Sequence, residues 1–286
     1  MEYFFSKNYN GFIYTIDMFR ISTRISIFDK KEIVKFLSTR GLKFWTNKSS
    51  GKYDENFMAD KLWIGIMKEV SHDLDYTINE NFLLSIEFNP NKISDFDIFL
   101  YNYFINHYNF KIKRFDLAVD IPHNINNLCF FDVFKKSYSV FYKDYNNKTF
   151  YIGKGDGHIK IYNKKIESNL DYELTRFEIT KEVDFDFNNY AYIDFRFPYI
   201  AYQPYLSSSD TDDVCDSLDA IIFAVNNGYP YKNLSRTYKS KIRKDFTGLS
   251  DLSNDVANEV CLQFINFIKS GISNKPDNLH YLTFDK

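Results

Sequence analysis

The sequence predicts an α+β protein: a large, mostly antiparallel sheet with helices on one face and an open opposite face, followed by a smaller helical C-terminal region. Aromatic residues make up 19% of the 286 residues, with 30 Phe and 23 Tyr. Such side chains favour half-buried strands. There are only 10 Gly and 6 Pro, so well-formed strands are expected. Several segments alternate apolar and polar residues, and a helical period replaces this alternation after Pro204.

The first hundred residues contain strand and helix patterns in alternation. Pro90 ends the second strand, and Ser94 followed by two acidic residues is typical of a helix start. The expected elements are a strand over Phe12–Ser26, a helix after Asp29, a loop over Lys48–Asn56, a strand over Phe82–Phe88 and a helix from Ser94 toward His107.

The next hundred residues read mainly as strands. The turn Gly155-Asp156-Gly157 is a hairpin signal of the Asp-Gly type. We expect strands over Phe110–Asp120, Phe150–Lys154, His158–Lys164, Tyr172–Thr180 and Tyr190–Phe197, with a helical or irregular segment over Phe131–Val140.

The composition and the period of the apolar residues change near residue 206, which predicts two regions. Ser207–Asp213 is polar and acidic, and apolar residues from Val214 to Val225 then follow a helical period. Residues 1–206 are therefore expected to form the α+β domain, in which residues 1–80 are an N-terminal segment and residues 81–206 carry the catalytic groups. Residues 207–286 are expected to be mostly helical.

Charge and cysteine content exclude several classes of protein. The 36 Lys and Arg against 38 Asp and Glu give a net charge of −2, which excludes wholesale wrapping of nucleic acid but leaves room for a local basic stripe. Cys129, Cys215 and Cys261 have no CxxC spacing, which indicates a reducing compartment and no thiolate zinc site. We expect a cytoplasmic protein without a secretory signal at Met1–Asn10 and without a membrane span.

Period-two alternation decides which polar side chains share a sheet face. Strand residues two apart point the same way, so Arg176 lies with Glu178, and Lys160 lies with Tyr162 and Lys164. If the strands are neighbours with their apolar faces under helices, four residues project onto one open face: Glu87, Asp116, Tyr162 and Glu178. Carboxylates suit a hard divalent cation, so we expect Mg²⁺ or Mn²⁺ bound by Asp116, Glu178 and Glu87.

The residues on this face have two interpretations, one catalytic and one as an ordinary solvated surface. A metal ion would polarise a phosphate oxygen while the Tyr162 oxygen attacks phosphorus, with Lys160 and Lys164 favouring the tyrosinate. Alternatively, tyrosines and carboxylates on a solvated strand face are common in a chain with 23 Tyr. The five histidines form no His-hydrophobic-His pair, so the histidine-clustered metal site of the best-known tyrosine nickases is absent.

A basic stripe interleaved with tyrosine lies in the C-terminal region, at residues 232–244. Each cation is able to neutralise a DNA phosphate, and the alternative is a solvated helix face. The residues assigned to DNA binding are Lys232, Arg236, Tyr238, Lys239, Lys241, Arg243 and Lys244.

Several segments together resemble one family, the Rep_trans replication initiators of small staphylococcal rolling-circle plasmids. Residues 86–92 read IEFNPNK, as in the family, and residues 160–167 read KIYNKKIE, similar to its RIYNKKxE segment with Lys160 in place of arginine. The other similar segments are RFDLAVD at 114–120, RFE at 176–178 and SRTYK at 235–239, in the family's order over roughly residues 80–245. The first 80 residues match poorly, and the last segment departs from the family after Lys239.

The resemblance implies an activity and its partners. Tyr162 would be the nicking nucleophile, which cuts one strand of a double-strand origin, forms a 5′-phosphotyrosyl intermediate, leaves a 3′-OH primer and religates at termination. The segment around Arg236 would recognise the origin. The implied partners are plasmid origin DNA, a second copy of the chain in a homodimer and a host helicase of the PcrA type. Two alternatives remain: a conjugative relaxase of the same family, and a non-catalytic origin-binding protein.

Overall fold

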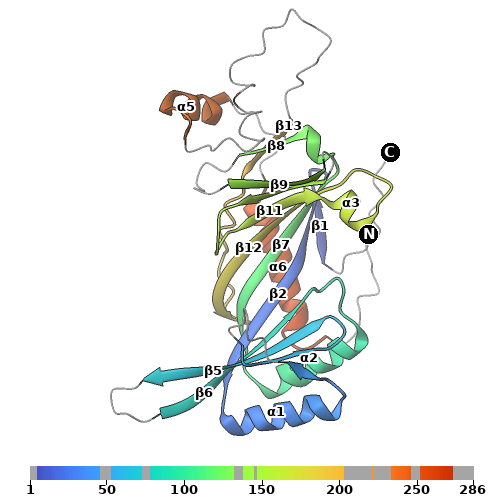
Figure 1. Cartoon of the computed structure of the whole chain (residues 1–286), viewed down its shortest axis with the longest axis vertical. Coiled ribbons are helices and arrows are strands. Elements are labelled where there is room, and N and C mark those ends of the chain that lie inside the picture. The colour runs from blue at the N-terminus through green and yellow to red at the C-terminus, as the bar shows by residue number, and fades with distance from the viewer. Residues whose placement is uncertain are drawn as a thin grey trace, which may run out of the picture.

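The structure is a computed structural model, and it describes residues 5–45, 53–72, 78–131, 138–144, 147–202, 221, 233–245 and 252–272. Its centre is a long twisted sheet of 11 strands in the order β3-β4-β5-β6-β2-β7-β12-β11-β10-β9, with β1 paired to β2 (Figure 1). Every strand pairing in the described ranges is antiparallel. The predicted fold class is confirmed.

The strands of the N-terminal half form one end of this sheet. β2 is the longest strand and pairs with β1, β6 and β7. The bounds are β1 (Ser6–Tyr9), β2 (Phe12–Ile25), β3 (Phe44–Trp45), β4 (Glu55–Met58), β5 (Leu62–His72), β6 (Ile78–Phe88) and β7 (Lys111–Ile121).

The later strands continue the sheet from β7 to the far edge. A second sheet contains only two strands, β8 and β13. The bounds are β8 (Leu128–Phe131), β9 (Tyr138–Asp144), β10 (Asn147–Ile152), β11 (Ile159–Asn163), β12 (Thr175–Asp186) and β13 (Tyr199–Tyr202), with a short 3-10 helix at Ile125–Asn127.

Helices α1 (Ile27–Thr39), α2 (Asp95–His107) and α6 (Asn254–Ile268) contribute to the same apolar core as the sheet. Ser26 and Ser94 each cap a helix, and each accepts a hydrogen bond from the backbone N–H of an aspartate three residues later, whose side chain in turn accepts from the backbone N–H of the cap. Phe264 of α6 contacts Phe19 of β2 edge to face, at 5.0 Å between ring centroids. The apolar sides of the central strands are thereby buried, and their polar sides form the open face.

The remaining helices are short. Helix α3 (Lys164–Ser168) directly follows β11, and α5 (Arg236–Asp245) lies apart from the sheet in Figure 1. None of the helices among the described residues is long and apolar enough to span a membrane. The predicted boundary near residue 206 lies outside the described residues.

Two predicted elements differ in the structure. Residues 138–140, expected to be helical or irregular, belong to strand β9. Residues 190–197, expected to be a strand, are irregular, because α6 side chains take their backbone hydrogen bonds. The Asn258 amide accepts from the N–H of Ile193 at 2.7 Å and donates to its C=O at 2.9 Å, and Asn254 accepts from the N–H of Phe195 at 3.1 Å.

Candidate active site

Strands β11, β12 and β7 bring the predicted catalytic residues side by side. In the register of these strands, Tyr162 is opposite Arg176, and Arg176 is opposite Asp120. Two pairs further along, Lys160 is opposite Glu178. The flanking residues Ile161 and Phe177 are fully buried on the helix side. The polar side chains therefore share the open face, as the alternation predicts.

Tyr162 and Glu178 are in direct contact. The Tyr162 hydroxyl donates a hydrogen bond of 2.6 Å to Oε1 of Glu178, and the Lys160 ammonium lies 3.4 Å from Oε2. Tyr162 is only 7% exposed, so its hydroxyl is held in one position by packing as well as by this bond. The pair has the geometry of a nucleophile with a proton acceptor.

The surroundings of the pair change both acidities. Burial, followed by the negative charge of Glu178, raises the pKa of Tyr162 well above its ordinary value, while Arg176 acts in the opposite direction. Burial and the charge of Asp17 raise the pKa of Glu178. The lysines were expected to favour the tyrosinate, but they lie against the tyrosine ring: the Nζ atoms of Lys160 and Lys164 are 4.1 and 5.7 Å from its centroid. Deprotonation of Tyr162 therefore depends on Glu178 as the acceptor.

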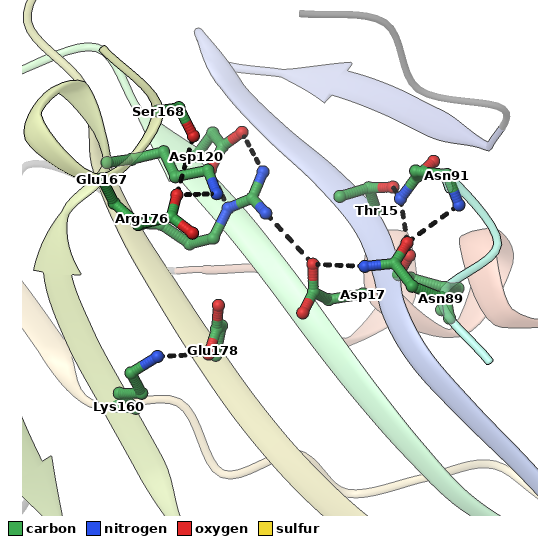
Figure 2. A network of polar contacts seen from close by, with 12 residues as sticks. Thr15, Asp17, Asn89, Asn91, Asp120, Lys160, Glu167, Ser168, Arg176 and Glu178 are labelled. Atoms are coloured by element: carbon green, nitrogen blue, oxygen red, sulfur yellow. Dashed lines mark hydrogen bonds and ion pairs between the residues drawn. The ribbon is translucent and has the colours of Figure 1, made fainter. Parts of the chain in front are cut away.

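Arg176 connects the strand pair to the rest of the face. Its guanidinium donates to both carboxylate oxygens of Asp120, at 2.6 and 2.8 Å, and to Oδ1 of Asp17 at 3.1 Å (Figure 2). The side chains of Arg176 and Asp120 are 4% and 1% exposed. A buried bidentate pair between a guanidinium and a carboxylate has a fixed orientation. Arg176 is therefore a rigidly placed positive charge beside Tyr162.

Asp17 is the residue of this site that the sequence pattern missed. It lies at an irregularity of β2, where the register with β7 shifts between Ile16 and Met18. A bulge adds one residue to a strand and breaks the alternation of faces. Asp17 also accepts a hydrogen bond of 3.2 Å from Asn89. Because the first 80 residues only poorly match the initiator family that the sequence resembles, neither the alternation nor the resemblance indicated this carboxylate.

The segment after β6 lies against the same network. Asn91 donates to the Ile16 carbonyl at 2.8 Å and to the Thr15 hydroxyl at 3.3 Å, as Figure 2 shows for Thr15. Asn89 and Asn91 belong to the IEFNPNK segment that resembles the initiator family. The polar residues of that segment thus fix the position of β2 around Asp17.

The structure does not gather the predicted metal ligands Asp116, Glu178 and Glu87 into one cluster. Within the described ranges, no group of three or more His, Cys, Asp or Glu side chains is arranged to hold a metal ion. Arg114 bonds both oxygens of Asp116, at 2.5 and 2.8 Å. Glu87 is ion-paired with Arg20. Both carboxylates are on the polar face as predicted, but arginines are their partners.

The third predicted catalytic residue, Lys164, begins helix α3 soon after Tyr162. Its side chain is 6% exposed and is ion-paired with Glu167 one turn later. The side chain of Asn163 caps the helix by accepting from the N–H of Ile166 at 3.2 Å. This turn ends the strand one residue after Tyr162, and it places the Lys164 ammonium 5.7 Å from the centroid of the tyrosine ring.

The structure describes the predicted DNA-binding stripe only partially. Arg236, Tyr238 and Lys239 lie on helix α5, together with the backbone of residues 241, 243 and 244. Lys232 and the side chains of Lys241, Arg243 and Lys244 lie outside what is described. Six of the seven predicted stripe residues therefore belong to one helix.

Comparison with known proteins finds only a distant structural likeness. No protein-family model matches the chain, and no curated protein matches it. The chain is similar to the solved rolling circle replication initiator protein from Geobacillus stearothermophilus, with a TM-score of 0.38 and 12% sequence identity, over 82% of this chain and 96% of that one. So distant a likeness says nothing about activity, and the assignment below rests on the residues of the site.

Proposed function

We propose that this chain is a plasmid rolling-circle replication initiator, a tyrosine DNA nickase and strand transferase with Tyr162 as its nucleophile. The observation that carries the proposal is the 2.6 Å hydrogen bond from the Tyr162 hydroxyl to Glu178, on an open sheet face beside Lys160 and Arg176. The segments around these residues are also those that resemble the Rep_trans initiators. A tyrosine that only filled a strand surface would need neither a partly buried carboxylate partner nor two neighbouring cations.

The arrangement supports a complete phosphoryl-transfer step. The Tyr162 oxygen attacks the scissile phosphorus as its proton passes to Glu178, and the bond from phosphorus to the 3′ oxygen breaks. The 3′ oxygen leaves and takes a proton from water, which gives a 3′-OH primer and a 5′-phosphotyrosyl link. The raised pKa of Glu178 makes it a better proton acceptor than an ordinary carboxylate. Lys160 supplies positive charge for the phosphate oxygens, and Arg176, which is bonded to Asp120 and Asp17, fixes the side chains around them.

We also propose a divalent cation, Mg²⁺ or Mn²⁺, in this site. The donor chemistry fits one: the negative charge of Asp17 raises the pKa of Glu178, so two carboxylates of this site are near enough to interact. Mg²⁺ is usually bound through one or two carboxylates, with waters and substrate phosphates completing its shell. Glu178 and Asp17 would hold the ion, which when bound polarises a phosphate oxygen.

The metal proposal is tested by the Mg²⁺ concentration that gives half-maximal cleavage. Asp17→Asn should raise this concentration, whereas Asp116→Asn should leave it nearly unchanged, because Arg114 bonds both oxygens of Asp116 while Arg176 and Asn89 both bond Asp17 at Oδ1. The opposite result would favour the ligand set predicted from sequence, with Asp116 and Glu87 beside Glu178.

Origin recognition is proposed for helix α5 and its basic stripe. Phosphate contacts set affinity, and base contacts set sequence choice. Arg236→Ala should flatten the preference for the cognate origin, because an arginine fork is able to bond O6 and N7 of guanine. Lys241→Ala should weaken all DNA about equally and reduce the salt slope by about 1. Loss of cleavage in Arg236→Ala on a saturating single-stranded substrate would instead place the stripe in the active site.

The test of the whole proposal uses a supercoiled plasmid carrying the cognate origin, incubated with the protein and Mg²⁺ and then denatured in SDS. We expect open circles covalently joined to protein. Tyr162→Phe should bind the same DNA and form neither product. Binding without nicking by the parent protein would support the non-catalytic origin-binding alternative. A homodimer and a host helicase of the PcrA type are proposed as partners on the resemblance alone.

A further inference from the structure

Three aromatic side chains form a row on the strands next to Tyr162. Phe141 of β9 contacts Tyr151 of β10 edge to face, with 5.5 Å between ring centroids and 86° between ring planes. Tyr151 stacks on His158, the residue before β11, at 5.7 Å and 17°. The row thus crosses the three strands at the edge of the sheet.

The strand register places this row on the open face. Thr149 is opposite both Phe141 and Tyr162, and Tyr151 is opposite Lys160. The alternate residues Phe150 and Ile152 are buried on the other side. Opposed residues in antiparallel strands point to the same face, so Phe141 and Tyr151 share the face of Tyr162 and Lys160.

Phe141 is left open at the end of the row. It is 63% exposed although its neighbour Tyr151 covers one edge, whereas Phe150 on the helix side is fully buried. The side chain of Lys160, the residue opposite Tyr151, is 37% exposed, and its Nζ lies 4.1 Å from the centroid of the Tyr162 ring. An exposed aromatic ring and a cation therefore lie on the same sheet face as the proposed nucleophile, on the neighbouring strands.

We propose that Phe141, Tyr151 and His158 form a stacking platform for the unpaired bases of single-stranded DNA next to the nick site. This inference rests on the proposed function, because Tyr162 fixes where the scissile phosphate lies. Proteins that bind single strands combine aromatic rings, which stack on bases of any sequence, with cations along the backbone. Bases in a duplex are already stacked on their neighbours, so this platform favours unpaired bases.

The test measures binding of a fluorescent oligothymidylate by the full chain. Phe141→Ala should bind it roughly five- to a hundredfold more weakly, the range for loss of one stacked base. The matched control is Phe28→Ala, which removes a ring that is 75% exposed on helix α1. It should bind like the parent. Duplex DNA should bind Phe141→Ala and the parent equally.

Two further variants separate stacking from general apolar contact. Phe141→Trp should retain the affinity of the parent, because it keeps a ring, and Phe141→Leu should lose affinity like Phe141→Ala. Unchanged affinity in Phe141→Ala, or full rescue by leucine, would overturn the platform. An effect confined to oligouridylate would assign it to RNA instead of DNA.

The outcome is distinguishable from failure of the proposed function. If the parent forms a covalent adduct through Tyr162 while Phe141→Ala binds the oligonucleotide normally, the nickase stands and the platform fails. If Phe141→Ala weakens binding but the parent forms no adduct on any DNA, the platform stands and the nickase fails. Phe141→Ala at saturating oligonucleotide should still form the adduct, because Phe141 does not touch the reacting atoms.

Discussion

Two sets of charged side chains lie on the open face, and the carboxylates of the two sets have different partners. In the arginine set, Arg114 pairs with Asp116, and Arg20 pairs with Glu87. In the tyrosine set, Glu178 accepts from Tyr162 and lies in the negative field of Asp17, and burial and that charge raise its pKa. An arginine stabilises the ionised form of the carboxylate that it pairs with. The net effect on Glu178 is the opposite, because burial and Asp17 outweigh Lys160, and its pKa is raised.

The largest expected effect in this comparison is on the Glu178 proton acceptor. Glu178→Gln keeps the size of the side chain but cannot accept the Tyr162 proton, so single-turnover cleavage should slow by about 10² to 10⁴. Thermal unfolding should remain near that of the parent. Glu87→Gln, in the arginine set, is the control and should cleave almost normally. Equal losses in both variants would remove the distinction between the two sets.

The next effect is on stability, through the buried pair of Arg176 and Asp120. Asp120→Asn removes the charge to which the buried guanidinium is bonded through two hydrogen bonds, so the free energy of unfolding should fall by about 3–5 kcal/mol. Glu69→Gln removes the partner of Arg24, whose side chain is 75% exposed, and should cost less than about 1 kcal/mol. Urea unfolding measures both. A similar small loss of unfolding free energy in both variants would show that the paired hydrogen bonds from Arg176 to Asp120 do not stabilise the fold.

The smallest expected effect is a shift in the pH dependence of cleavage. The reaction needs ionised Glu178, so its rate should rise with pH through the pKa of that group, which lies above the ordinary carboxyl value because of burial and the charge of Asp17. The charge of Lys160 lowers this pKa. Lys160→Met should therefore move the acidic limb of the rate profile to higher pH. A shift to lower pH would contradict the assignment of Glu178 as the acceptor.

The sequence predicted the strand interior of the site better than its irregular parts. Alternation placed Tyr162 and Glu178 on one face because β11 and β12 pair regularly there. It missed Asp17 because a bulge changes the facing of residues. It also assigned metal ligation to Asp116 and Glu87, since a shared face does not reveal which arginines occupy a carboxylate.

The strand predicted at residues 190–197 shows a related limit. Its buried residues Ile193 and Phe195 do alternate with exposed ones. Their backbone, however, bonds to Asn258 and Asn254 of a helix some 60 residues away in sequence, at 2.7 and 3.1 Å. Alternation reports which side chains are buried, but it does not identify the partner of the backbone.

The most direct test of the account is to locate the covalent link. A single-stranded oligonucleotide containing the nick site, labelled at its 3′ end, is incubated with the protein and Mg²⁺, and the adduct is digested with nuclease and trypsin. The account predicts that the label migrates with the protein and that mass spectrometry finds the residual nucleotide on the peptide Ile161-Tyr162-Asn163-Lys164. A nucleotide on any other tyrosine, or cleavage without an adduct, would contradict it.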